Sequence, residues 1–246
     1  MSTVHSPDVK SSDPGAGSQP VRTALLSVFD KSGVLDLARS LQGHGARILA
    51  SGGTARALRD ADVPVLSIEE YTGLVAGYGG RVKTLHPKVH AGILARRDVP
   101  GDLAELEDDD AFPIDLVCVN LYPFEDAVAA GASEAERIEK IDIGGPAMIR
   151  AAAKNWKHVA VVCDPADIPG LVDELDENGG RLSAATRKRL AAKAFERTSA
   201  YDAAITAELS ADLAPAGLAP RLGLSLAKVQ DLRYGENGRA SCRERV

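Results

Sequence analysis

The stretch Ile114-Asp-Leu-Val-Cys-Val-Asn-Leu121 is the clearest candidate for a buried strand in this chain of 246 residues. It is a short, mostly apolar run of the kind that strands of parallel sheets show. Similar runs occur at residues 23–28, 46–50, 64–68 and 159–163, and residues 91–95 are a further candidate strand. Segments with helical character, such as residues 34–41 and 147–153, separate these runs. Strands that alternate with helices predict an α/β fold, a doubly wound parallel sheet inside a three-layer sandwich.

The composition is that of an ordinary globular protein, with 45% hydrophobic and 26% charged residues. The formal net charge of -6 argues against a nucleic-acid-binding protein, which would normally contain a basic domain. No apolar run approaches the roughly 20 residues that a membrane span needs, and the N-terminus lacks the apolar core of a signal peptide. Three cysteines without C-x-x-C spacing fit buried, reduced thiols. We therefore expect a cytoplasmic protein with no nucleic-acid or membrane partner.

Polar segments follow three of the predicted strands, at residues 29–31, 51–54 and 120–122. Ligands of parallel sheets bind outside the carboxyl ends of the strands. Since all three segments lie at that end, we expect them to converge on one site.

The segment Ser51-Gly52-Gly53-Thr54 lies between a strand and the start of a helix. Glycines in this position can form a loop whose backbone N–H groups point outward at an anion. A simple tight turn is the alternative explanation for the glycine pair. The flanking hydroxyls of Ser51 and Thr54 favour a phosphate loop.

Positive charge is concentrated just after the third strand. Residues 72–97 contain five Lys or Arg and no acidic residue, whereas residues 98–110 contain seven acidic residues and no base. Arg81 and Lys83 follow the glycine pair Gly79-Gly80. A solvated basic face is the usual explanation for such residues, but this placement favours an anionic ligand.

The two ends of the chain differ from its centre. Residues 1–20 are rich in Ser, Pro and Gly, and we expect a disordered tail. Residues 21–182 form the predicted α/β domain, and residues 183–224 a long Ala-rich helix followed by a linker. Residues 225–246 have the character of the opening of a further domain, with a tail that does not look native.

Other residues have simpler alternative explanations. His86 and His90 are four residues apart, but Pro87 lies between them and no H-E-x-x-H glutamate is present, so we expect no metal site. Asp142, before Gly144-Gly145, could merely cap a helix. Lys154 could be a C-terminal cation that the helix dipole stabilises.

Six motifs, in this order, resemble those of one known family: Ser51-Gly-Gly-Thr54, Gly80-Arg-Val-Lys-Thr-Leu-His-Pro87, Val89-His-Ala-Gly-Ile-Leu94, Asn120-Leu-Tyr-Pro-Phe124, Ile141-Asp-Ile-Gly-Gly145 and Arg150-Ala-Ala-Ala-Lys-Asn155. The chain closely resembles the N-terminal IMP cyclohydrolase domain of the bifunctional purine biosynthesis protein, whose other domain is AICAR formyltransferase. The resemblance extends over roughly residues 21–237. Residues 228–237 resemble the start of the formyltransferase domain, and the remaining residues depart from the family.

The resemblance implies a methylglyoxal-synthase-like fold with a C-terminal helical extension. It also implies a homodimer whose activity needs neither cofactor nor metal. The implied reaction converts 5-formamidoimidazole-4-carboxamide ribotide to IMP with loss of water. The residues implied to bind this purine ribotide are Lys31, Ser51, Gly52, Gly53, Thr54, Arg81, Thr84, Asn120, Ile143 and Gly144.

The implied catalytic residues are Lys154, Asp142, Lys83 and Tyr122. An amide nitrogen attacks a formyl carbon, so the reaction needs a proton acceptor, a proton donor and stabilisation of an oxyanion. By resemblance, Lys154 donates or accepts the proton with Asp142 as its partner, and Lys83 and Tyr122 polarise the reacting groups. Backbone N–H groups of Ile143 and Gly144 would hold the oxyanion.

One geometric difficulty and two alternatives stay open. If residues 147–153 form an unbroken helix, its rise of about 1.5 Å per residue separates Asp142 and Lys154 by roughly 15 Å. The alternatives are a nucleotide-binding regulatory module of the same fold and methylglyoxal synthase itself. The first would not need Asp142 and Lys154, and the second acts on a triose phosphate.

Overall fold

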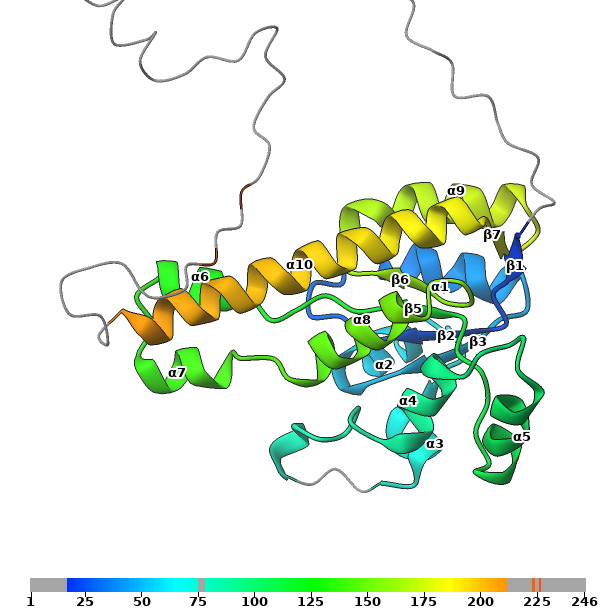
Figure 1. Ribbon diagram of the computed structural model, residues 1–246, viewed down its shortest axis with the longest axis horizontal. Helices are drawn as coiled ribbons and strands as arrows, with labels where there is room; N and C mark the ends of the chain where they lie inside the picture. Colours follow the sequence, from blue (N-terminus) through cyan, green and yellow to red (C-terminus); the bar gives the residue numbers. More distant parts are fainter. Residues whose placement is uncertain (1–16, 75–77, 212–222, 224–225, 227–246) are drawn as a thin grey trace, which may run out of the picture.

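A five-stranded parallel sheet forms the centre of the protein in a computed structural model that describes residues 17–74, 78–211, 223 and 226 (Figure 1). Its strands are β2 (Thr23–Leu26), β3 (Arg47–Ala50), β4 (Leu66–Ser67), β5 (Leu116–Cys118) and β6 (Ala160–Val162). Their order across the sheet is β4-β3-β2-β5-β6. In the central strand β2, Leu25 lies opposite Leu49 on one side and Val117 on the other. The predicted parallel sheet is confirmed.

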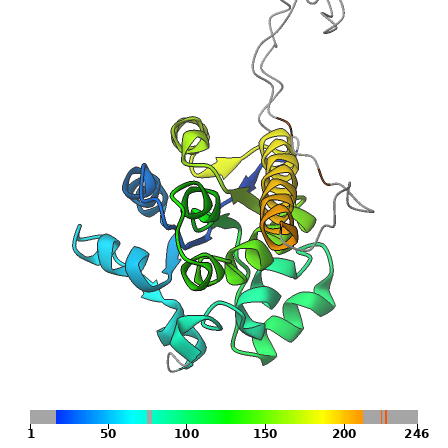
Figure 2. The same cartoon turned by 90° about the vertical axis from the view of Figure 1, so that its left-hand side faces the viewer.

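Helices cover both faces of the sheet, as Figure 2 shows with several of them seen end-on. On one face, α1 (Val34–Gly43) packs against β3 and α9 (Ile168–Glu177). On the other face, α8 (Gly144–Lys154) packs against β5, β6 and α4 (Pro87–Leu94). The three-layer arrangement is therefore confirmed.

Shorter elements connect these layers. Helix α2 (Gly52–Arg59) packs against β3 and β4. The remaining elements before the last helix are β1 (Gln19–Pro20), α3 (Ile68–Thr72), η1 (Tyr78–Gly80), α5 (Pro100–Asp108), α6 (Phe124–Ala129), α7 (Glu134–Glu139), η2 (Pro165–Asp167) and β7 (Arg181–Leu182).

The core is built almost entirely from aliphatic side chains, as the low aromatic content predicts. The neighbouring strands β2 and β5 contain four fully buried side chains, those of Leu25, Leu26, Leu116 and Val117. Each such side chain contributes about 1.5–3 kcal/mol when it leaves water. These residues also fix the backbone of the strands, and so the positions of the loops at their carboxyl ends.

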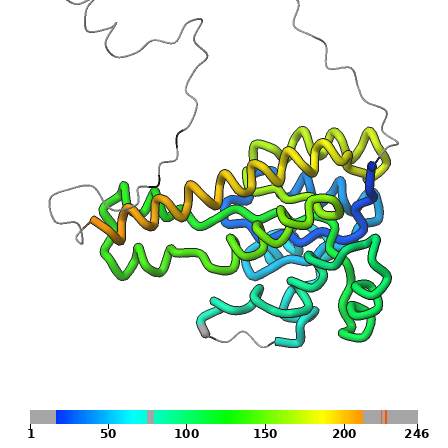
Figure 3. The backbone as a smooth tube through the Cα atoms, in the orientation of Figure 1, coloured from blue at the N-terminus to red at the C-terminus, as the bar shows by residue number. Residues whose placement is uncertain are grey.

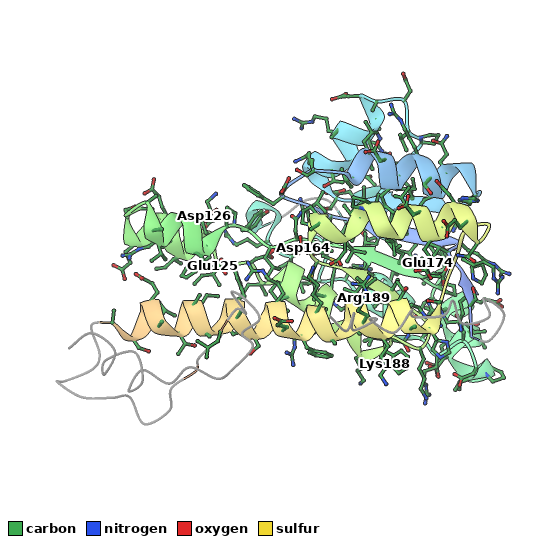
Figure 4. All side chains as sticks on the ribbon, turned by 90° about the horizontal axis from the view of Figure 1, so that it is seen from above. Glu125, Asp126, Asp164, Glu174, Lys188 and Arg189 are labelled. Carbon is green, nitrogen blue, oxygen red and sulfur yellow. The ribbon has the colours of Figure 1, made fainter. Side chains whose placement is uncertain are left out.

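The last helix, α10 (Ala184–Ser210), begins after Ser183, whose hydroxyl accepts the backbone N–H of Thr186. Its first half packs on β6 and α8, and its second half extends beyond the sheet beside α6 and α7 (Figure 3). There Arg197 donates to Glu125 of α6 over 2.8 Å, and Figure 4 labels Glu125 between the two helices. The predicted long helix is confirmed.

Two local predictions are wrong. The possible strand at residues 91–95 is instead mostly helical, within α4, because His86 caps a helix that begins with Pro87. Gln19 and Pro20, placed in the disordered tail, pair with β7. The acidic segment at residues 98–110 contains the largely exposed helix α5. Residues 1–16 and most of the predicted linker and C-terminal segment lie outside the described residues.

Two cysteines, Cys118 and Cys163, are buried free thiols, as the sequence predicts. Burial raises the pKa of Cys118 to about 12 and that of Cys163 to about 11, so both stay protonated near neutral pH. Across residues 17–74 and 78–211, no helix combines the length and the apolar character that a membrane span requires.

Candidate functional site

A cavity of about 260 Å³ lies at the carboxyl edge of the sheet. The loops that follow β2, β3 and β5 line it, together with residues 79–84 and 138–145. Most of the predicted site residues meet here, as the position of ligands in parallel sheets suggests. Those that line the cavity are Ser51, Gly53, Thr54, Arg81, Lys83, Thr84, Asn120, Tyr122, Asp142, Ile143 and Gly144.

The start of α2 forms one wall of this cavity. The first N–H groups of a helix have no acceptor within the helix and attract anions. Gly52 has φ +45°, and a Cβ added to it would lie 2.7 Å from the Lys83 ammonium nitrogen. A Cβ added to Gly53 would lie 3.8 Å from the ammonium nitrogen of Lys31. Two cations therefore flank the helix N-terminus, although Lys31 and Gly52 do not line the cavity itself.

The two hydroxyls of this loop have different surroundings. Thr54 is buried, and its hydroxyl accepts the N–H of Val28 over 3.0 Å and donates to the Val28 carbonyl over 3.1 Å. The Ser51 hydroxyl lies 2.5 Å from that of Ser27, which also lines the cavity. Thr54 thus holds two loops together, and Ser51 is the better placed of the two to meet a ligand.

The side chain of Asn120 holds the loop after β2. Its Oδ1 accepts the N–H groups of Phe29 over 2.6 Å and Asp30 over 3.1 Å, and its Nδ2 donates to the Asp30 carbonyl over 2.7 Å. These bonds commit the amide oxygen to the protein backbone. The arrangement favours a positioning role for Asn120 over the direct contact with the ribotide that the resemblance implies.

Asp142 lies just before α8, with its carboxylate beside the first turn of that helix. The Gly145 N–H donates to its Oδ1 over 2.9 Å, so the side chain satisfies one of the free donors at the start of the helix. Burial raises the pKa of Asp142, and hydrogen bonds from the N–H groups of Gly145, Tyr122 and Gly144 oppose this shift. The raised pKa makes this carboxylate a stronger base than a free aspartate.

Both glycines at the start of α8 are required by close contacts. A Cβ added to Gly144 would lie 2.5 Å from the Thr84 hydroxyl, and one added to Gly145 would collide with the Asp142 carboxylate. Helix α8 begins at Gly144, three residues before the predicted start. The glycine pair therefore lets the N-terminus of α8 approach the cavity closely.

Two polar residues of the cavity, Ser27 and Glu139, are absent from the predicted site residues. Ser27 is the first residue after β2, so the rule that ligands bind at strand ends would have indicated it. Glu139, whose carboxylate lies 3.4 Å from the Arg81 guanidinium, gave no such signal. Both side chains of this pair are exposed, and exposed pairs contribute only about 0–1 kcal/mol.

Lys154 is not brought to this cavity. It is the exposed last residue of α8, which runs unbroken from Gly144, so about 15 Å of helix separates it from the cavity end. The next residue, Asn155, donates to the carbonyls of Ile93 and Ala95 over 2.8 and 3.0 Å. The expected partnership of Lys154 with Asp142 therefore does not occur within one chain.

The matches to known proteins agree with this geometry. Residues 33–147 match the MGS-like domain, and residues 152–242 match the family described as the AICARFT/IMPCHase bienzyme. The fold and the cavity thus define an MGS-like domain with a cation-flanked cavity at the carboxyl edge of its sheet. The chain belongs to the AICARFT/IMPCHase bienzyme family, which confirms the resemblance found in the sequence.

Individual relatives give the extent of the similarity. The bifunctional purine biosynthesis protein PurH of Nostoc punctiforme is 50% identical over 219 residues, and that of Myxococcus xanthus is 52% identical over 214 residues. These alignments cover 88% and 87% of this chain, but 43% and 41% of the relatives. The chain thus spans less than half the length of these curated relatives. The protein in the crystal structure of ForH has 42% sequence identity to this chain, and the two structures superpose with a TM-score of 0.65. The match covers 75% of this chain and 96% of that one.

Proposed function

We propose that this chain is an IMP cyclohydrolase, which closes the second purine ring of 5-formamidoimidazole-4-carboxamide ribotide with loss of water. The observation that carries the proposal is a cavity with a cation-flanked helix N-terminus on one wall and the half-buried carboxylate of Asp142 on another. Family membership supports it, since the family description includes IMPCHase activity. The formyl transfer of the bifunctional relatives is not assigned to this chain.

The ribotide phosphate would bind at the start of α2. Backbone N–H groups of Gly52 and Gly53 would donate to it, with the Ser51 hydroxyl and the ammonium group of Lys31 nearby. The Arg81 guanidinium would release Glu139 and donate two hydrogen bonds to the phosphate. Thr54 and Thr84, both buried, would support the loops on either side.

The reacting groups would then lie beside Asp142. As the carboxamide nitrogen attacks the formyl carbon, Asp142 takes the proton that the nitrogen loses. The new C–N bond leaves a negative charge on the formyl oxygen, near the backbone N–H of Ile143 at the start of α8. Lys83 or Tyr122 protonates this oxygen to a hydroxyl. Asp142 then returns its proton to the hydroxyl, the C–O bond breaks, and water leaves. The formamide nitrogen forms the C=N bond and gives its proton back to Lys83 or Tyr122.

The proposal includes a purine ribotide as the small-molecule partner, a homodimer, and a cytoplasmic location, which the buried free thiols favour. Lys154 has no part in the reaction of a single chain. It would have one only if a second copy brought its Lys154 to the cavity.

The direct test is to supply the purified chain with the formylated ribotide and to follow IMP formation by absorbance. We expect turnover well above the uncatalysed rate. A folded sample that binds IMP without turnover would instead be the regulatory module. A sample that converts a triose phosphate to methylglyoxal, but not the ribotide to IMP, would be methylglyoxal synthase.

A further inference from the structure

A buried hydroxyl connects the long C-terminal helix to the cavity. Tyr201 lies on α10 and is 1% exposed. Its oxygen accepts the backbone N–H of Asp142 over 2.9 Å and donates to the carbonyl of Lys140 over 3.0 Å. The ring packs edge-on against Phe124, with centroids 6.2 Å apart, and lies 5.5 Å from the Arg197 guanidinium. The hydroxyl therefore has a fixed position and two backbone partners.

These bonds hold the backbone around Asp142, while its carboxylate has a separate partner. The carboxylate accepts the N–H of Gly145, while the backbone N–H of the same residue donates to Tyr201. The segment between α7 and α8 therefore cannot rotate without breaking a bond at one end or the other. Phenylalanine could fill the same space, but it could neither accept from Asp142 nor donate to Lys140, and buried backbone groups rarely stay unpaired.

We propose that Tyr201 is a positioning residue for Asp142. Its hydroxyl fixes the backbone at Asp142 so that the carboxylate stays over the first turn of α8 and faces the cavity. Tyr201 does not line the cavity, so it acts through Asp142 and touches no substrate. The inference rests on the proposed function, in which Asp142 accepts a proton. It gives the helical extension a role in the reaction as well as in packing.

The size of the effect follows from the demands of proton transfer. A displacement of about 1 Å at a reacting group can cost roughly a hundredfold in rate. Without Tyr201 the segment can turn toward water, and the carboxylate then loses both its alignment and its burial. Binding of the phosphate, at the start of α2, does not depend on this segment. The expected signature is a lower kcat with an almost unchanged KM.

The test compares Tyr201→Phe with Tyr71→Phe in the full chain. Tyr71 is a matched control because it is buried on α3, does not line the cavity, and its hydroxyl accepts one backbone N–H, from Phe112, over 3.3 Å. We expect Tyr201→Phe to lower kcat by about 10- to 100-fold with KM within about threefold of wild type. The acid limb of its pH profile should move to lower pH, because burial no longer raises the pKa of Asp142. Tyr71→Phe should match wild type in kcat, in KM and in the acid limb of the pH profile.

Wild-type kcat and pH profile in Tyr201→Phe would overturn the proposal, as would an equal loss in Tyr71→Phe. If the wild-type chain forms no IMP, the proposed function fails and hydrogen exchange still decides the positioning role. Faster exchange of residues 139–145 in Tyr201→Phe alone supports it, and unchanged exchange overturns it. If Tyr201→Phe does not fold, the wild-type Asp142 amide is measured by NMR. Protection supports the bond to Tyr201, and free exchange excludes it.

Discussion

The two edges of the central sheet both carry positive charge, but the surroundings of their cations differ. At the amino edge, a hollow of about 690 Å³ is lined by Arg22, Arg47 and Arg97. Arg97 is largely buried, and its guanidinium donates to the Ile114 carbonyl over 2.6 Å and to Asp115 over 3.4 Å. The Arg47 guanidinium lies 4.2 Å from the centre of the Phe112 ring. Arg97 is thus paired with a carboxylate and Arg47 is held against a ring, while the side chain of Arg22 is exposed.

The carboxyl edge has cations whose charge is still available. In the described ranges 17–74 and 78–211, no carboxylate lies within salt-bridge distance of Lys31 or Lys83. The cavity's one ion pair in these ranges, Arg81 with Glu139, is exposed and weak. The comparison teaches that the number of cations does not identify an anion site. At the carboxyl edge Lys31 and Lys83 also lie beside the start of α2, whose first N–H groups add to the attraction for an anion.

The largest expected effect at the carboxyl edge is that of Asp142→Asn. Since the variant cannot accept a proton, kcat should fall at least about a hundredfold. In the wild type, activity should decline on the acid side at a pH above the ordinary pKa of aspartate, because burial raises the pKa of Asp142 and protonation abolishes its role. A pH series of kcat/KM for both proteins measures this limb, which the variant should lack.

Lys154→Ala is the control at the other end of α8. If the reaction uses one chain, this variant should keep kcat near that of wild type. A loss as large as that of Asp142→Asn would mean that a second copy supplies Lys154 to the cavity.

The next prediction compares the loss of one cation at each edge of the sheet. Arg81→Ala should raise KM about 10- to 100-fold with a smaller change in kcat, because a charge-assisted hydrogen bond contributes about 1.5–3 kcal/mol. Arg47→Ala removes a cation from the amino edge and should leave KM unchanged. Steady-state kinetics of both variants at two salt concentrations would test this. An equal rise in KM for both would show that net charge, not the cavity, attracts the ribotide.

A change at the amino edge should affect stability instead of catalysis. Asp115 accepts the N–H groups of Arg22 and Thr23 on one oxygen and Arg97 on the other. Asp115→Asn leaves only one acceptor oxygen and turns an amide toward Arg97, so we expect a loss of about 2 kcal/mol. Thermal unfolding should then show Tm lower by about 4–8 °C. A large fall in kcat with unchanged Tm would contradict the assignment of this edge to structure.

The smallest expected effect is a gain. Glu139 competes with an incoming phosphate for Arg81, so Glu139→Gln should tighten binding of IMP by about two- to fivefold, as an exposed pair is worth about 0.2–1 kcal/mol. Calorimetric titration at low salt measures this. Glu134→Gln, on the same helix but away from the cavity, should leave the affinity unchanged. Weaker binding in Glu139→Gln would mean that Glu139 contacts the ligand itself.

The sequence was informative where function depends on local order along the chain. Strand ends predicted the cavity edge, and the glycines before α2 and α8 predicted close backbone approach. It could not predict that Thr54 is engaged by Val28, or that Tyr201 holds Asp142. The partners of the second pair are 59 residues apart and meet only through packing of α10. Residues 91–95 were misread because a short apolar run suits a buried helix and a strand equally.

A shortened form of this protein needs the second half of α10 to be active. The sheet is complete at Val162, so a form ending soon after it would still contain every strand of the central sheet. Such a form would lack Tyr201, and also Arg197, whose bond to Glu125 holds α6. Helix ends open more readily than cores. If α10 unwinds from Ser210 inward, Tyr201 releases Asp142 before the central sheet unfolds. On heating, loss of activity should therefore precede global unfolding.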